Sequence, residues 1–580
     1  MLKDLLTGFI KRHALSYTAG ILILFGCASI AMRIPGMLGG ITDALVSQFL
    51  SRQEILRRVL LVMSLALIVF SLKFVWRWFL IGNSRAVEVY LRGALFRHLQ
   101  TLPLGFYSEH KTGDLVAHAI NDVQAIRMAF GPGFIQSLDG ITTGILSVFF
   151  MSRLINPRLA ILAVLPVPFA ILLMFILAPM IRQRFRNVQE AYAAIADRIQ
   201  ESISGIRIIK SFAQEKDEVK RFIGLSGERV SAQIRLTKIS ALLTPGIQIC
   251  FGFSFLLFII YGSRLIQAGQ ISVGDFIAFN LYLLALMAPV TTVGRIIDLI
   301  QKGNASYSRL EDLFNISDNR LHRIKQDAFQ LLGAIEFRHV SFRYPGAVGP
   351  TLEDISFKIK SGETFGIAGA TGSGKTTIAN LILRLYDPDS GEILIDGENI
   401  QDIPVDVLRE SIGYVPQDNF LFSTTIKNNI EFFSQSYKME EIEEAARLSE
   451  IYDNIISFPD GFDTLVGERG VTLSGGQKQR VSIARALIKD PAILILDDSL
   501  SAVDSKTEQD ILKNIRRLLE KRSGILISHR LSTIEKADHI ILLDRGRIIE
   551  QGSHRDLIRN KGTYTFLWEV QSGNGGNKHE

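Results

Sequence analysis

The segment GATGSGKT at 369–376 has the composition and spacing of a loop that binds phosphate. Its glycines let backbone N–H groups curl around phosphate oxygens, Lys375 can reach the β- and γ-phosphates, and the Thr376 hydroxyl can bind Mg²⁺. An expected strand at 363–368 precedes the loop and an expected helix follows it, which is the context such a loop requires. We therefore expect nucleotide contacts from Gly369, Ala370, Thr371, Gly372, Ser373, Gly374, Lys375, Thr376 and Thr377.

A second chemical signal is a carboxylate at the end of a buried strand. The apolar run ILIL at 493–496 is typical of a parallel strand covered on both faces, and Asp497 follows it directly. Such a strand delivers its last side chain beside the phosphate loop, where Asp497 should hold Mg²⁺ through water. The pattern predicts a site for ATP and Mg²⁺, with Thr376 and Asp497 beside the metal.

Between these two elements lies LSGGQ at 473–477, followed by an expected helix at 478–488. Two glycines before a helix N-terminus form a further anion site, because free backbone N–H groups and the helix dipole favour negative charge. We expect the donors of this site to point outward. An outward site of this kind needs a partner.

The order of the phosphate loop, LSGGQ and ILILDD resembles the ATP-binding-cassette (ABC) family, and the apolar first half resembles the membrane domain of its exporter half-transporters. The resemblance covers nearly the whole chain. It implies that two ATPase domains pair head to tail. Ser474, Gly475, Gly476 and Gln477 of one chain would then close over the nucleotide in the phosphate loop of a second half-transporter chain.

The resemblance also assigns roles to residues that, taken alone, would be interpreted as a surface tyrosine or a core histidine. Tyr344 would stack on adenine. Gln417 would contact Mg²⁺ and sense the γ-phosphate, and His529 would polarise the γ-phosphate. Asp504 would contact the opposite subunit.

Asp498 departs from the family pattern, in which active members usually carry a Glu that positions and deprotonates the attacking water. A carboxylate shorter by one methylene lies about 1.5 Å too far back, and a misplacement of about 1 Å can cost roughly a hundredfold in rate. We expect ATP to bind and hydrolysis to be slow. The pattern resembles the degenerate subunit of heterodimeric bacterial multidrug exporters. The catalytic residues expected are Asp498, His529 and Gln417. The alternative is a homodimer that hydrolyses slowly through Asp498.

Composition indicates that these elements share the chain with a membrane domain. The 580 residues exceed what one hydrophobic core usually supports, and 47% hydrophobic with 21% charged residues suggest an apolar half joined to a soluble half. The net charge of +6 is not gathered into one stripe, so we expect no nucleic-acid partner. Cys27 and Cys250 lie in apolar runs and are interpreted as packing residues.

Six stretches approach the ~20 apolar residues that a membrane-spanning helix requires. They are approximately 14–38, 59–81, 134–152, 159–181, 243–263 and 276–294. The connections after the second and fourth spans are long, helical in pattern and rich in basic residues, so the positive-inside tendency places them in the cytoplasm. An even number of spans then places both termini inside, in a multi-pass protein of the inner (cytoplasmic) membrane.

Each long connection should form a helical hairpin whose tip contacts the ATPase. The tips are expected at 106–115 and 205–215, and Glu468 with Arg469 would face these hairpins by family resemblance. The alternative is a solvated turn. Residues 2–13 place Leu, Phe and Ile at helical spacing beside basic residues, which favours a helix on the inner membrane face over a plain cytosolic helix.

Four charged residues within or beside the spans carry a functional hypothesis, because burying charge in hydrocarbon is costly. They are Arg33, Lys73, Arg77 and Asp139. They could line a polar translocation path, with Asp139 paired to one of the bases. Equally, Lys73 and Arg77 could extend their charged ends to the membrane interface.

The fold class expected is a membrane α-helical domain of six spans with long cytoplasmic extensions, followed by an α/β P-loop ATPase domain of ABC type. The boundaries expected are 1–310 for the transmembrane domain, 311–332 for a linker, 333–572 for the ATPase and 573–580 for a tail. The resemblance implies ATP-driven export of amphipathic drugs or lipids, in contact with membrane lipid. A homodimeric lipid flippase or a peptide exporter is the alternative.

Overall fold

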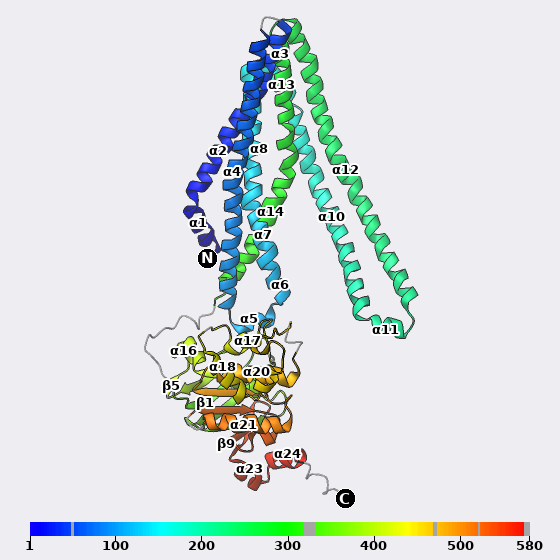
Figure 1. The fold of residues 1–580 in the computed structure, drawn as a ribbon. Coiled ribbons are helices and arrows are strands. Elements are labelled where there is room, and N and C mark those ends of the chain that lie inside the picture. The colour runs from blue at the N-terminus through cyan, green and yellow to red at the C-terminus, as the bar shows by residue number, and fades with distance from the viewer. Residues whose placement is uncertain (48–50, 318–330, 435, 468–472, 520–521, 573–580) are drawn as a thin grey trace. The chain divides into compact units, whose positions relative to one another are not determined.

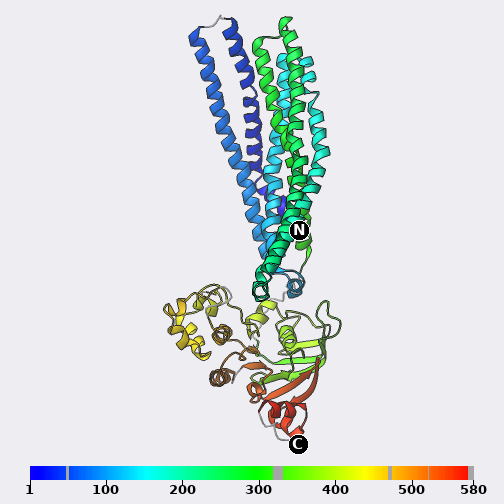
Figure 2. The same ribbon diagram turned by 90° about the vertical axis from the view of Figure 1, so that its right-hand side faces the viewer.

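The computed structural model describes residues 1–47, 51–317, 331–434, 436–467, 473–519 and 522–572. The chain divides into two units, drawn in Figures 1 and 2. The first comprises Met1–Gln100 and Thr112–Ile316, and the second comprises Thr101–Lys111 together with the chain from Ser317 onward. The predicted tail, most of the predicted linker, and Glu468 with Arg469 lie outside the described residues.

Long helices dominate the first unit. In chain order, its helices are α1 (Leu2–Arg12), α2 (Ala14–Ala31), α3 (Ile34–Ser47), α4 (Arg52–Gln100), α6 (Thr112–Ala117), η1 (His118–Asp122), α7 (Val123–Met128), η2 (Ala129–Gly133), α8 (Phe134–Phe150), η3 (Met151–Ile155), α9 (Pro157–Val164), α10 (Val167–Ser204), α11 (Ile206–Ser211), α12 (Glu215–Gln267), α13 (Val273–Ala285) and α14 (Met287–Asn315). The η1, η2 and η3 segments are π-helical. They continue the neighbouring α-helices with one locally wider turn each.

Six helical stretches in the described residues are long and apolar enough to cross a membrane, which confirms the predicted number of spans. They are Ala14–Ser47, Arg52–Gln100, Thr112–Ile155, Pro157–Ser204, Glu215–Gln267 and Val273–Asn315. Each contains one predicted span and extends beyond it. The 53 residues of α12 measure about 80 Å at the helical rise of about 1.5 Å per residue, well beyond the roughly 30 Å of a hydrocarbon core.

The predicted second hairpin is formed by α10, α11 and α12. The long helices α10 and α12 run as a pair joined by α11, as Figure 1 shows. Val188 on α10 is buried with Ala232 and Leu236 on α12, which closes the pair through small and branched side chains. Ile208 and Phe212 at the α11 end are exposed, so the tip presents apolar side chains. Its contact with an ATPase remains a prediction.

The tip of the first hairpin is α5 (Leu104–Glu109), which belongs to the second unit with the rest of Thr101–Lys111. A Cβ placed on Gly105 would lie 3.7 Å from Pro345 Cγ and 3.9 Å from Tyr386 Cε1, so α5 packs closely on the ATPase. Phe106 is buried and stacks on His110 at 4.1 Å between ring centroids. The predicted contact of this tip with the ATPase is therefore confirmed.

The predicted amphipathic N-terminal helix is α1. Leu2, Leu6 and Phe9 are buried on one face, whereas Lys3 and Lys11 are exposed. Apolar residues at i, i+4 and i+7 form a single stripe along a helix, which fits a helix lying against the bundle at the edge of the membrane.

At one end of the bundle, α3 and α13 meet through glycines. A Cβ on Gly39 would lie 2.4 Å from the carbonyl oxygen of Gly274, so a larger residue would force the helices apart. Asp43 on α3 accepts hydrogen bonds from the Ser272 hydroxyl and the Gly274 N–H, each at 2.6 Å. The Asp43 carboxylate thereby satisfies N–H and O–H donors at the first turn of α13.

A polar cluster ties η1 to α14. The buried Asp122 accepts hydrogen bonds from the Ser306 hydroxyl at 2.8 Å and from Arg309 Nε at 3.1 Å, and Arg309 also forms an ion pair with it. His118 Nδ1 lies 2.6 Å from the same carboxylate. Because three partners share one buried carboxylate, this contact fixes the register of the two segments.

The expected pairing of Asp139 is found only as an attraction without direct contact. Within the part of the chain that the structure describes, Asp139 forms no ion pair within 4.0 Å, but Lys73 and Arg77 lie near enough to attract its carboxylate. The Arg77 guanidinium lies 5.4 Å from the centroid of the neighbouring Trp76 ring instead. Cys27 is buried and Cys250 is half-buried among apolar side chains, as predicted, and neither is in a disulfide.

The second unit is an α/β domain with two sheets. Its strands are β1 (Ile335–Phe342), β2 (Leu352–Ile359), β3 (Thr364–Gly369), β4 (Ser390–Ile395), β5 (Glu398–Asn399), β6 (Ile412–Val415), β7 (Ile493–Asp497), β8 (Ser523–Ile527), β9 (His539–Asp544) and β10 (Arg547–Gly552). One sheet is antiparallel with the order β2-β1-β4-β5, and the other has the order β10-β9-β3-β8-β7-β6. In the larger sheet, neighbours from β9 to β6 are parallel and β10 is antiparallel to β9.

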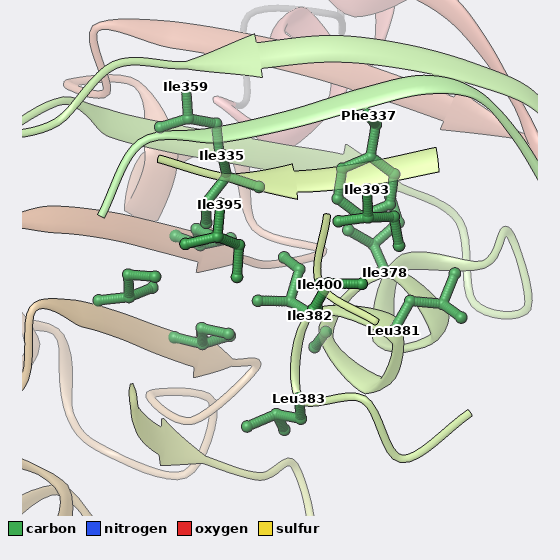
Figure 3. Close-up of a cluster of buried hydrophobic side chains, with 14 of the residues drawn as sticks. Ile335, Phe337, Ile359, Ile378, Leu381, Ile382, Leu383, Ile393, Ile395 and Ile400 are labelled. Carbon is green, nitrogen blue, oxygen red and sulfur yellow. The ribbon is translucent and has the colours of Figure 1, made fainter. Parts of the chain in front are cut away.

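The helices of this domain cover the sheets. Besides α5, they are α15 (Lys375–Ile382), α16 (Val405–Glu410), α17 (Ile426–Glu431), α18 (Met439–Leu448), α19 (Tyr452–Ile456), η5 (Gly461–Asp463), α20 (Gly475–Leu487), α21 (Ser505–Leu519), α22 (Leu531–Ile534), α23 (His554–Asn560) and α24 (Thr563–Gln571). Figure 3 shows Ile378 and Ile382 of α15 facing Ile393 of β4 and Phe337 of β1. Because α15 follows the phosphate loop directly, this apolar cluster fixes the loop.

One predicted element begins earlier than expected. The helix expected from residue 478 begins at Gly475, because Ser474 and Gln477 form a reciprocal capping box at its N-terminus. The expected strands before the phosphate loop and before Asp497 are found as β3 and β7.

Candidate functional site

The loop between β3 and α15 adopts a conformation that requires glycine. Gly369, Gly372 and Gly374 have φ angles of 152°, 83° and 102°. A Cβ on Gly369 would lie 2.4 Å from the Leu543 carbonyl oxygen, and one on Gly374 would lie 2.6 Å from Leu352 Cδ2. Bare backbone at these positions is what allows consecutive N–H groups to approach an anion closely.

Lys375 closes this loop from the first turn of α15. Its Nζ donates hydrogen bonds to the carbonyl oxygens of Gly369 and Ala370, each at 2.8 Å. Burial lowers the pKa of Lys375, while attraction by Asp498 and Asp497 acts in the opposite direction. The Ser373 hydroxyl is buried against Gly369, 2.6 Å from a Cβ placed there, and has no hydrogen-bond partner in this structure.

Asp497 is delivered by β7, in which every residue is buried. Burial raises the pKa of Asp497, and a hydrogen bond from Thr376 opposes this rise. A desolvated carboxylate beside a threonine hydroxyl is a donor set that a hard oxygen-seeking cation such as Mg²⁺ prefers. Gln417, exposed at the end of β6, lines the same pocket as Thr376 and Asp497.

Asp498 and His529 form a direct contact. His529 Nδ1 lies 2.8 and 2.9 Å from the two oxygens of the Asp498 carboxylate, and the Asp498 backbone has a φ of 48°. The Asp498 side chain is 15% exposed and that of His529 is 49% exposed. One ring nitrogen of His529 is therefore taken up by the Asp498 carboxylate, and the second ring nitrogen is left for another partner.

These side chains converge on one pocket of about 260 Å³. Its lining from the predicted set is Tyr344, Thr371, Gly372, Gly374, Lys375, Thr376, Thr377, Gln417, Asp497, Asp498 and His529. Gly369, Ala370 and Ser373 belong to the same loop but do not line the pocket. Thr351 lines it as well, and no motif identified that residue.

Tyr344 stands at the edge of this pocket. Its hydroxyl lies 3.1 Å from the Thr377 hydroxyl and accepts a hydrogen bond from Asn380 Nδ2 at 3.1 Å. The Tyr386 ring meets the Tyr344 ring edge-on, with centroids 5.1 Å apart. Tied at the hydroxyl and packed on one edge, the half-buried ring is held ready to stack on a planar base.

Ser474, Gly475, Gly476 and Gln477 do not line this pocket. They form the N-terminus of α20, where Gln477 N–H donates to Ser474 Oγ at 3.3 Å. Ser474 and Gly475 are exposed. The outward orientation predicted for this second anion site is therefore found.

The segment after Asp498 packs against this exposed helix start. Gln479 of α20 accepts a hydrogen bond from the Ala502 N–H at 3.0 Å and donates one to the Ser501 hydroxyl at 3.3 Å. A Cβ on Gly476 would lie 2.9 Å from the Ala502 carbonyl oxygen. Asp504, at the end of the segment, accepts from Thr507 N–H at 3.0 Å, and hydrogen bonding from Thr507 lowers its pKa.

The arrangement fits a nucleoside triphosphate with Mg²⁺. The glycine loop and Lys375 suit phosphate oxygens, Thr376 and Asp497 suit the metal, and Tyr344 suits the base. Asp498 and His529 line the same pocket and contact each other directly. Their direct contact joins residues 31 positions apart, which a motif reading of either residue alone does not show.

Comparisons with known proteins agree with this geometry. Residues 17–290 match the family model described as the ABC transporter transmembrane region, and residues 352–501 match the one described as ABC transporter. The chain is 38% identical over 564 residues to a probable multidrug resistance ABC transporter ATP-binding/permease protein, YheI, of Bacillus subtilis, covering 97% of this chain and 96% of the relative.

Two further similarities extend over the full length. A multidrug resistance-like ATP-binding protein, MdlA, of Escherichia coli is 34% identical over 570 residues, covering 98% of this chain and 96% of the relative. The solved structure of a bacterial Atm1-family ABC exporter with ATP bound is similar with a TM-score of 0.79 and 27% identity, covering 98% of this chain and 99% of that chain.

Proposed function

Because the chain belongs to the ABC transporter family, as a half-transporter with its transmembrane region and ATPase in one polypeptide, we propose that it exports amphipathic drugs or lipids across the bacterial cytoplasmic membrane. The observation that carries this proposal is the triphosphate pocket on a chain with six apolar spans. The multidrug names of the full-length relatives support the substrate class.

The nucleotide roles follow from the pocket. Tyr344 stacks on adenine, the loop from Gly369 to Thr377 with Lys375 holds the phosphates, and Thr376, Gln417 and Asp497 hold Mg²⁺. Bound Mg²⁺ neutralises charge on the phosphates. The exposed Ser474 at the start of α20 supplies donors to the nucleotide of a partner chain, so two ATPases close over two nucleotides.

The transport cycle links this closure to the membrane. ATP binding brings the ATPases together, the α5 and α11 tips transmit the movement along the long helices, and a path between the spans opens outward. Both termini face the cytoplasm. Arg33, Lys73, Arg77 and Asp139 remain candidates for the lining of the polar path.

We further propose that the partner is a different half-transporter chain and that the ATP site of this chain is slow. Asp498 is shorter than the usual Glu, and its carboxylate is already engaged by His529 at 2.8 and 2.9 Å. The shorter side chain holds the carboxylate farther from the water that it must orient and deprotonate. The partner would supply its own Glu opposite the intact Ser474–Gln477 segment.

The decisive experiment measures ATP hydrolysis by the purified chain in lipid nanodiscs. We expect slow turnover by the unmodified chain and a rise of roughly ten- to a hundredfold in kcat for Asp498→Glu, with little change in KM, because the longer side chain restores the position of the base. Lys375→Ala gives the background rate of ATP hydrolysis.

Brisk turnover by the unmodified chain alone would contradict the heterodimer proposal. Recovery of the chain from its native membrane with a second, similar chain in equal amount would support it, and recovery as a pure homodimer would not.

A further inference from the structure

One side chain from the C-terminal helix holds the loop that carries His529 through two hydrogen bonds. The loop connects β8 to α22, and Gln571 of α24 contacts its backbone on both sides of Arg530. Gln571 Nε2 donates to the His529 carbonyl oxygen at 2.9 Å, and the Leu531 N–H donates to Gln571 Oε1 at 2.9 Å. One planar amide thus satisfies an acceptor and a donor two residues apart.

The position of Gln571 is fixed by the packing of α24. Tyr564, Trp568 and Gln571 occupy positions i, i+4 and i+7, so they lie on one face of the helix. Tyr564 is fully buried and lies 2.9 Å from His554 Nδ1 through its hydroxyl, while Trp568 meets the His554 ring edge-on at 4.7 Å. A helix anchored by an aromatic pair holds the amide of its last turn at a defined place.

Arg530, between His529 and Leu531, connects the loop to the segment after Asp498. Its Nη2 donates to the Ser501 carbonyl oxygen at 3.1 Å, and its Nη1 lies 3.5 Å from Glu508. Glu508 in turn accepts from the Thr533 hydroxyl at 2.7 Å. The backbone of the His529 loop is therefore held from one side by α24 and from the other by the segment that follows the Asp498 carboxylate.

The loop has room to move when it is released. A cavity of about 660 Å³ lies beside it, lined by His529, Arg530, Trp568 and Gln571 among others. His529 lines both this cavity and the nucleotide pocket. A small rotation of the loop backbone would carry the imidazole away from Asp498 and toward the cavity.

We propose that Gln571 is a positioning residue for ATP hydrolysis: its amide holds the His529 loop so that the imidazole stays on Asp498 and at the γ-phosphate side of the pocket. This inference rests on the proposed ATP hydrolysis, but the two hydrogen bonds from Gln571 lie within this chain and are independent of the partner chain. The C-terminal helix thereby contributes to the chemistry without touching the nucleotide.

The test compares three substitutions in the full-length chain in nanodiscs. Gln571→Met keeps length and packing but loses both hydrogen bonds, Gln571→Ala loses all, and Gln571→Glu keeps the acceptor for Leu531 N–H and loses the donor. The matched control is Glu569→Gln, an exposed side chain on the same helix turn.

Two readouts separate positioning from folding. Hydrogen exchange of a peptide spanning residues 526–534 should accelerate about tenfold in Gln571→Met and Gln571→Ala, with little change in the control or in the rest of the ATPase. Single-turnover hydrolysis, followed over hours because this site is slow, should fall about three- to tenfold in rate, with less than a twofold change in ATP affinity. Gln571→Glu should lie between.

Unchanged exchange in Gln571→Met would show that the Gln571 amide does not hold the His529 loop. Accelerated exchange with an unchanged hydrolysis rate would show that holding the loop has no role in catalysis. Because exchange does not depend on turnover, the two failures are distinguishable: unchanged exchange would contradict the hydrogen bonds of Gln571, whereas single-turnover hydrolysis no faster than in Lys375→Ala would contradict hydrolysis at this site.

Discussion

Asp498 occupies a backbone conformation that most residues avoid. Its φ of 48° lies in the left-handed region, which costs on the order of 1 kcal/mol for a residue with a Cβ. Its N–H donates to the Ile527 carbonyl at 2.8 Å, and its carbonyl accepts from the Ser501 hydroxyl at 3.0 Å. These two bonds hold the strained residue so that its side chain meets His529. Strain that the surroundings maintain in this way is typical of functional positions.

Tyr344 allows the contribution of the adenine platform to be measured. Tyr344→Leu removes the ring and should weaken ATP binding about tenfold, because stacking of an aromatic side chain on a base contributes about 1–3 kcal/mol. Tyr344→Phe keeps the ring but loses the contacts with Thr377 and Asn380, so a loss of about two- to threefold is expected.

Binding of a fluorescent ATP analogue checks both values, with Arg343→Gln at the exposed neighbouring residue as control. If Tyr344→Leu bound as well as the unmodified chain, the stacking role would be wrong.

At the scale of elements, the polar cluster around Asp122 joins η1 to α14, the last helix before the second unit. Asp122→Asn keeps the shape but removes the negative charge that Arg309 and His118 face. We expect a loss of about 1–2 kcal/mol, moderated because the Arg309 side chain is 52% exposed and can be solvated.

The measurement is the apparent melting temperature of the detergent-solubilised chain, which should fall by a few degrees. Asp114→Asn, at an exposed position of α6, should leave it unchanged. An equal shift in both variants would argue against a special role for the cluster.

Elements and motifs that depend on local pattern were predictable from the sequence. The six spans follow from runs of apolar residues, and the phosphate loop with Lys375 follows from glycine spacing between a strand and a helix. Gln571 was not predictable, because its role arises from contacts across 40 and 42 positions of the chain rather than from neighbours. Thr351 was not predictable either, because it lines the pocket without belonging to a motif. The charges of Asp139, Lys73 and Arg77 could be seen in the sequence, but whether their side chains form a direct ion pair could not.

At the scale of the whole molecule, the phosphate pocket lies in the ATPase of this chain, while the exposed start of α20 does not line it. In the proposed assembly, each nucleotide site therefore takes one half from each of two chains. A chain built in this way completes its chemistry only with a second copy or a similar chain.

Ser474→Asp tests whether the start of α20 serves the nucleotide of a partner chain. The carboxylate retains an N-cap acceptor for α20 but directs negative charge at the γ-phosphate of the partner's nucleotide, so hydrolysis by the assembled pair should fall at least about tenfold. ATP binding to the pocket of this chain should be unchanged.

Glu444→Gln, at an exposed position of α18, is the control for an unrelated surface change. Loss of nucleotide binding by this chain itself would show that Ser474 serves its own pocket, contrary to the proposal.

The scarcity of thiols has a practical consequence. Cys27 is buried with its sulfur 3.6 Å from the Val69 carbonyl oxygen, and Cys250 is half-buried, and both are free. Two small substitutions would yield a chain without background reactivity. Distances between pairs of spin labels on α5, α11 and α24 could then be measured in lipid membranes, and would report how far each tip moves during a single round of nucleotide turnover.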